Sequence, residues 1–191
     1  MISTALSETR GLSIEDYRID LDSDRDLVFL LRSFRLWLIG LRHNTPACLE
    51  EVWNDFANRL GGSDGKEALA ALAGCIKVIQ LHARRRIRHH PPCCRYVTAD
   101  EAGFLGVIAA CQAGNPAVSS RRAEWLVKVR GRQELLEACN RLARLLQDKG
   151  LVISLQGEAA LSNMTPEPEP EPAETNVRRT RRTTNKPVAT D

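Results

Sequence analysis

Apolar residues recur every three or four positions through most of this chain, and this period limits its fold more than any other feature. From Leu27 to Leu41, and again from Leu135 to Leu146, the apolar side chains fall on one face of a helix. Residues that begin or end helices separate such stretches. A chain of 191 residues is long enough for one domain of ordinary size plus a tail. We therefore predict an all-α fold, a compact bundle of about six helices that occupies residues 24–161.

Capping residues mark several of the predicted helix ends. Thr45 is followed by Pro46, which is typical of an N-cap with proline at the first helical position. Glycine at position 61 predicts the end of that helix. Thr98 and Glu101 have the spacing of a capping box, in which each side chain binds the other residue's backbone amide. This pattern predicts the start of a fourth helix.

Other boundaries are predicted from weaker signals. The third helix is expected to run past His82 through the basic residues 84–88, until two consecutive prolines stop it. The fifth helix is expected to begin near Ser119 or Ser120. Gly131 is expected to separate the fifth helix from the sixth.

Both ends of the chain differ from its helical middle. Residues 1–23 are polar and acidic, and predict a loosely ordered arm. Residues 162–191 alternate proline with glutamate and then become rich in arginine, so they predict a disordered tail that buries little apolar surface. Within the helical domain, we expect a boundary between two smaller parts near residues 91–97.

The chain lacks the sequence features of membrane or exported proteins. Its most apolar stretch is interrupted by Arg32 and Arg35, and its first residues do not resemble a signal peptide. We therefore expect a cytoplasmic protein whose six cysteines are reduced. Three of them lie on apolar helical faces and are expected to be small buried residues: Cys75, Cys111 and Cys139.

A basic stretch is the first candidate binding feature. Between Lys77 and Arg95 there are six cationic residues and no acidic one. Four arginines fall within five positions: Arg84, Arg85, Arg86 and Arg88. A helix end needs fewer cations than this, so the stretch favours a polyanion partner, either nucleic acid or an acidic protein surface. The acidic arm of the same chain is the alternative partner.

A loop rich in histidine and cysteine is the second candidate feature. Four residues surround two prolines: His89, His90, Cys93 and Cys94. Imidazole and thiolate groups suit zinc. A second, well-separated pair of ligands is missing, so an ordinary interhelical loop is the other interpretation. The adjacent cysteines also suggest a labile disulfide. A metal- or redox-responsive helical protein is therefore the alternative function.

The order of elements after Tyr96 is the third candidate feature. A capped helix, a short helix and a longer helix precede Gly150, Leu151 and Val152. This order resembles the winged helix-turn-helix domain of bacterial regulators, with residues 151–155 as the first wing strand. The resemblance implies that the last helix enters the major groove of DNA. It implies five candidate base-reading residues: Arg132, Gln133, Glu137, Asn140 and Arg141. A plain helical bundle is the other interpretation, because no second wing strand is evident.

The tail carries a second cluster of cations that could contact a polyanion: Arg178, Arg179, Arg181 and Arg182.

No glycine-rich phosphate loop, serine elbow or His-Glu-x-x-His motif is present. We therefore predict a non-enzymatic regulatory or interaction protein that binds a polyanion. Nucleic acid is the preferred candidate for this partner, and an acidic protein surface is the second. No cofactor is expected apart from zinc at the His/Cys loop.

Overall fold

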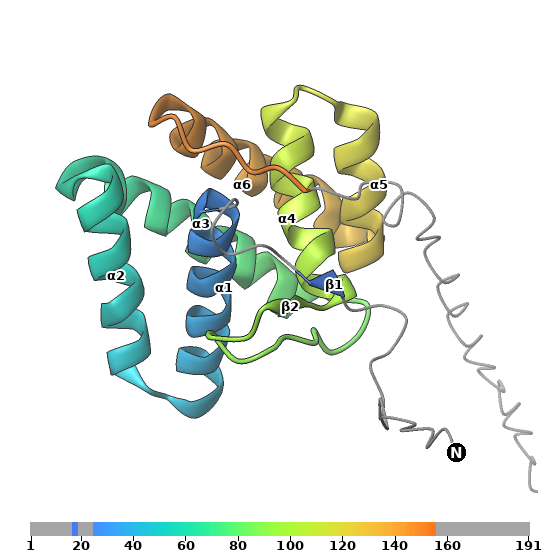
Figure 1. Cartoon of the computed structure of the whole chain (residues 1–191). Coiled ribbons are helices and arrows are strands. Elements are labelled where there is room, and N and C mark those ends of the chain that lie inside the picture. The colour runs from blue at the N-terminus through green and yellow to red at the C-terminus, as the bar shows by residue number, and fades with distance from the viewer. Residues whose placement is uncertain (1–16, 19–24, 156–191) are drawn as a thin grey trace, which may run out of the picture.

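A computed structural model describes residues 17–18 and 25–155, and there the chain forms a bundle of six helices with two very short strands (Figure 1). The elements in chain order are β1 (Tyr17–Arg18), α1 (Arg25–His43), α2 (Pro46–Leu60), α3 (Gly62–His82), β2 (Tyr96–Val97), α4 (Ala99–Gln112), α5 (Pro116–Leu126) and α6 (Val129–Asp148). The predicted all-α bundle is confirmed. The rest of the acidic arm and the whole tail, with Arg178, Arg179, Arg181 and Arg182, lie outside the described residues. None of the described helices has the length and apolar character needed to cross a membrane.

Local capping signals explain the helix starts that were predicted correctly. Helix α2 begins at Pro46, as predicted, but the Thr45 side chain makes no capping hydrogen bond, so proline at the first helical position is the signal that holds here. In α4 both bonds of the capping box are present. The Glu101 amide donates to Thr98 Oγ1 over 3.2 Å, and the Thr98 amide donates to Glu101 Oε2 over 2.9 Å. These contacts depend only on residues close in sequence.

The predicted continuation of α3 through residues 84–88 is wrong, because the helix ends at His82. Ala83 instead forms an isolated antiparallel bridge with Val127. The Lys128 amide donates to the His82 carbonyl over 2.8 Å, and the Arg84 amide donates to the Leu126 carbonyl over 3.1 Å. These long-range hydrogen bonds replace those of another helical turn, so the arginines lie in a loop.

Two further boundaries differ from prediction. Helix α5 begins at Pro116 rather than near Ser119 or Ser120, because the Asn115 side chain caps it by accepting from the Val118 amide over 3.1 Å. Gly131 lies inside α6 and does not interrupt it. A Cβ atom at this position would lie 2.4 Å from the His82 Cβ, so glycine allows α6 to approach the end of α3 closely.

The strand predicted for residues 151–155 is absent. Leu151, Ile153 and Leu155 are buried while Val152 is exposed, so the alternating pattern reflects burial on one side only. The side chain of Gln112 serves this segment in place of a partner strand. Its Nε2 donates to the Leu151 carbonyl, and its Oε1 accepts from the Ile153 amide, each over 2.9 Å. No wing therefore exists within the described part of the chain.

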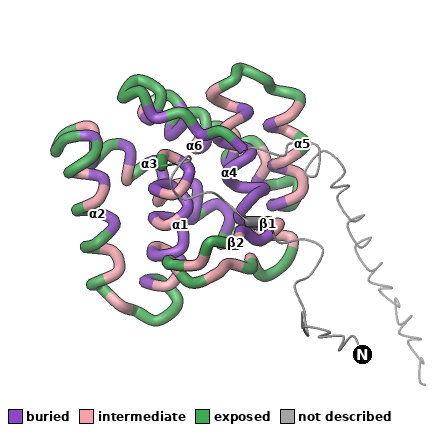
Figure 2. Tube along the Cα trace, in the orientation of Figure 1, coloured by how far each residue is buried: buried purple, intermediate pink, exposed green. Residues whose placement is uncertain are grey.

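One hydrophobic core connects all six helices. Helix α3 packs against α2 and α6, and α4 packs against α5 and α6. Figure 2 shows buried residues gathered on α1, α3 and α4, whereas the outer side of α2 is largely exposed. Phe34 of α1 stacks on Phe104 of α4 with ring centroids 4.5 Å apart. Cys75 of α3 and Cys139 of α6 are both fully buried, as predicted, while Cys111 is half-buried.

Candidate nucleic-acid interface

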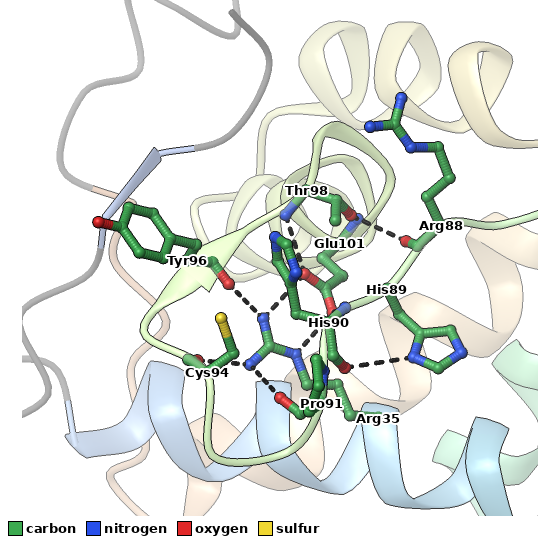
Figure 3. A network of polar contacts seen from close by, with 9 residues as sticks. All are labelled: Arg35, Arg88, His89, His90, Pro91, Cys94, Tyr96, Thr98 and Glu101. Carbon is green, nitrogen blue, oxygen red and sulfur yellow. Dashed lines mark hydrogen bonds and ion pairs between the residues drawn. The ribbon is translucent and has the colours of Figure 1, made fainter. Parts of the chain in front are cut away.

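The loop between α3 and α4, residues 83–98, includes the short strand β2 and is organised around a buried ion pair (Figure 3). Arg35 of α1 is 1% exposed and Glu101 of α4 is fully buried. Arg35 Nε donates to Glu101 Oε1 over 2.6 Å, and Nη2 donates to Oε2 over 2.9 Å. This is a bidentate pair, which fixes the relative position of the two side chains.

The remaining hydrogen-bonding capacity of the pair is used by the loop backbone. Arg35 also donates to three carbonyl oxygens of the loop, those of Pro91, Cys94 and Tyr96. Glu101 accepts from the amides of His90 and Thr98. A buried charge is tolerated when it is paired and hydrogen-bonded in this way. The loop therefore has a defined path although it contains almost no regular secondary structure.

Sequence reasoning missed this pair, although one signal for it was present. Arg35 follows Leu31 by four residues and precedes Leu38 by three, so it lies on the apolar face of α1. A cation at such a position requires a buried acidic partner. The partner itself was not identifiable, because Glu101 lies 66 residues away in sequence.

Arg85, a predicted nucleic-acid contact, instead anchors the loop to the bundle. Its Nη2 lies 2.5 Å from Oδ1 of Asp100, a carboxylate that is only 2% exposed. The other oxygen of Asp100 accepts from the Arg88 amide over 2.8 Å. The guanidinium also lies 4.3 Å above the ring of Trp125, a cation–π contact. The charge of Arg85 is therefore largely offset by Asp100.

The bridge between Ala83 and Val127 brings two basic segments together. Arg84 and Arg86 follow one side of the bridge, and Lys128 and Arg130 follow the other. We call these four residues, Arg84, Arg86, Lys128 and Arg130, the basic corner. Of these, Arg86, Lys128 and Arg130 are exposed, and none of the three pairs with a carboxylate among the described residues.

The charge balance of the folded part strengthens this feature. Residues 25–155 contain 20 lysines and arginines but 12 aspartates and glutamates, so their formal charge is +8, against +3 for the whole chain. The bundle is therefore more basic than the full sequence suggests, and the terminal segments carry the compensating acids. A surface of this kind attracts polyanions.

The predicted base-reading residues of α6 occupy several environments. Arg132 pairs with Glu124, with Nη1 3.0 Å from Oε1, and Gln133 donates to Glu137 over 2.8 Å. Asn140 and Arg141 are exposed but lie about 15 Å along α6 from Arg130. Along α6, Arg132 and Gln133 therefore lie within one turn of Arg130, whereas Asn140 and Arg141 lie about three turns from it. Arg88 is exposed on the same loop as Arg86.

The His/Cys loop does not gather its four predicted metal ligands. Figure 3 shows the rings of His89 and His90 pointing away from each other. The structure places Cys94 against Arg35 through its carbonyl oxygen, and Cys93 is exposed. Across the described residues, no group of three or more His, Cys, Asp or Glu side chains is arranged to hold a metal ion. The pattern in the sequence thus corresponds to a loop ordered by Arg35 and Glu101.

Comparison with known proteins reveals no relative of this chain. No protein-family model matches the sequence, and neither a curated protein nor a solved structure matches it. What the protein binds is therefore inferred from its own geometry and charge.

Thiol reactivity should follow burial. In native protein treated briefly with iodoacetamide at pH 8, Cys93 should be alkylated first, and Cys75 and Cys139 should stay protected, because they are fully buried. Burial raises the pKa of Cys139, and burial together with nearby Cys75 raises the pKa of Cys111 to about 11. About one Cys111 in a thousand is then ionised at pH 8, and only the thiolate reacts.

Peptide mass spectrometry measures this order, with urea-unfolded protein as the control in which all six cysteines react. Alkylation of Cys75 or Cys139 as fast as Cys93 would show that the interface between α3 and α6 opens readily.

Proposed function

We propose that this protein is a non-enzymatic nucleic-acid-binding protein that contacts backbone phosphates through the basic corner. One observation carries the proposal: the Ala83–Val127 bridge joins two exposed basic segments that are 44 residues apart in sequence. Phosphate contacts need exposed cations on a fixed framework and supply most of the affinity of non-specific binding. The buried pair of Arg35 and Glu101 supplies that framework for the loop.

The proposal concerns the nucleic-acid backbone and not base recognition. Of the predicted base-reading residues, Arg132 and Gln133 lie nearest to Arg130 along α6. Arg132 donates a hydrogen bond to Glu124, and Gln133 donates one to Glu137. The exposed acids Glu134 and Glu137 lie on α6 as well, and they would repel phosphates along its outer face. Binding should therefore depend strongly on salt and weakly on sequence. A regulatory role in the cytoplasm belongs to the same proposal, and six free cysteines fit a reducing compartment of this kind.

Neutralising the basic corner should weaken binding to duplex DNA and reduce its salt dependence. The test variant combines Arg86→Gln, Lys128→Gln and Arg130→Gln in the full chain. Each phosphate contact contributes about 0.9 to the slope of log affinity against log salt, so loss of three contacts should lower the slope by about 2.7. Fluorescence anisotropy with a labelled 20-base-pair duplex at several salt concentrations measures this slope.

A matched control removes the same charge elsewhere. Arg25→Gln, Lys66→Gln and Arg144→Gln neutralise three exposed cations. Lys66 lies about 24 Å along α3 from His82, and Arg144 lies about 21 Å along α6 from Arg130. This control should retain most of the slope. If the slope falls equally in both variants, the effect comes from net charge and not from the position of the basic corner. Loss of binding only on deletion of residues 162–191 would place the contacts in the tail and contradict the proposal.

A further inference from the structure

A groove lies beside the basic corner, between the carboxyl-terminal ends of α1 and α3 and the beginning of the loop. Its volume is about 440 Å³. Sites for small ligands range from about 300 to 1,000 Å³, so this groove can hold one or two large side chains of a peptide. Of the four residues of the basic corner, only Arg86 also lines this groove.

The floor of the groove is apolar and partly open. Leu38 and Ile79 form its buried part, and Ile87 of the loop is half-buried beside them. Leu41 also lines the groove, and its side chain is 42% exposed. Covering it would remove apolar surface from water, which is favourable at about 25 cal/mol per Å².

The rim of the groove is basic. Arg42 and Arg86 are exposed on two sides of it, and Arg85 is a third rim residue whose charge Asp100 offsets. The lining residues come from positions 38–42 and 79–87, and neither segment contains aspartate or glutamate. The rim therefore presents positive charge that these segments leave uncompensated.

We infer that this groove binds an acidic segment of a partner protein through a central aliphatic or aromatic anchor. The anchor covers Leu41 and fills the apolar floor, while flanking carboxylates face Arg42 and Arg86. Charge complementarity and the apolar floor together select this class of ligand. Nucleic-acid phosphates would meet the arginines but leave Leu41 uncovered. Because Arg86 belongs to both sites, duplex DNA and the acidic segment should compete for the protein.

The experiment uses two synthetic probes and the full chain. The first probe is a fluorescein-labelled 12-residue peptide in which glutamates flank a Leu-Phe pair, and the second has serine at those two positions. Anisotropy should show at least about tenfold tighter binding of the first peptide, because one anchoring side chain contributes about 1.5–3 kcal/mol and 1.4 kcal/mol is tenfold. Equal affinity for both peptides would overturn the inference.

Variants of the protein locate the contact. Leu41→Ser removes apolar surface without changing charge, and it should weaken binding of the anchored peptide about tenfold while leaving duplex binding unchanged. The matched control is Val152→Ser, since Val152 is 59% exposed and lies outside this groove. Arg42→Gln should lower the salt dependence of peptide binding. If Leu41→Ser binds the peptide as tightly as the unaltered chain, the groove is not the site.

Two further outcomes separate this inference from the proposed function. The double variant Lys128→Gln with Arg130→Gln tests the nucleic-acid proposal alone, because it leaves Arg86 and the apolar floor of the groove intact. It should weaken duplex binding and leave peptide binding unchanged. If the anchored peptide binds only after residues 1–16 are deleted, the chain's own acidic arm occupies the groove. That result would overturn the inference of a separate partner.

Discussion

Replacing Glu101 by alanine should lower the free energy of unfolding by about 3–5 kcal/mol, because it leaves a buried arginine without its counter-charge. Arg35 is 1% exposed and loses both bonds to the carboxylate. The amides of His90 and Thr98 lose their acceptor as well. Urea unfolding followed by far-ultraviolet circular dichroism measures the change, provided that the unfolding slope stays constant.

Two surface ion pairs of one arginine provide the control. Arg32 contacts Glu51 and Asp55, but all three side chains are about one-third exposed or more. Arg32→Ala should therefore cost no more than about 1 kcal/mol. The double variant Arg35→Met with Glu101→Leu should recover only part of the stability, since three loop carbonyls still lack their donor. A cost for Glu101→Ala as small as that of Arg32→Ala would refute the structural role of the pair.

Replacing Phe104 by alanine should cost about 3–5 kcal/mol of unfolding free energy. Its side chain is fully buried and stacks on Phe34, so truncation leaves a cavity between α1 and α4. In a double-mutant cycle with Phe34→Leu, the aromatic pair should contribute a coupling of about 0.5–1.5 kcal/mol. Val152→Ala, at an exposed position, should change stability by less than about 0.5 kcal/mol. A cost below about 2 kcal/mol for Phe104→Ala would mean that α1 and α4 pack more loosely than described.

Two of the four residues of the basic corner were predicted from the sequence. Arg84 and Arg86 were identified from the run of arginines at positions 84–88, which gave no reason to expect Lys128 and Arg130 beside them. Their proximity depends on the bridge between Ala83 and Val127. Lys128 and Arg130 were missed, although they alternate with Arg132 in sequence, because nothing in the sequence places them beside Arg84 and Arg86. Arg85 was assigned a binding role, since a list of residues cannot show that Asp100 offsets its charge.

The sequence by itself determined the helical fold and most helix starts, because these depend on interactions within a few residues. The capping box of Thr98 and Glu101 joins positions three apart, and the apolar period repeats every turn. Only the tertiary structure decided where α3 ends, which arginines are exposed, and that Arg35 is buried against Glu101. Those outcomes depend on contacts between residues 44 and 66 positions apart, and they form only when helices that were already specified locally pack together.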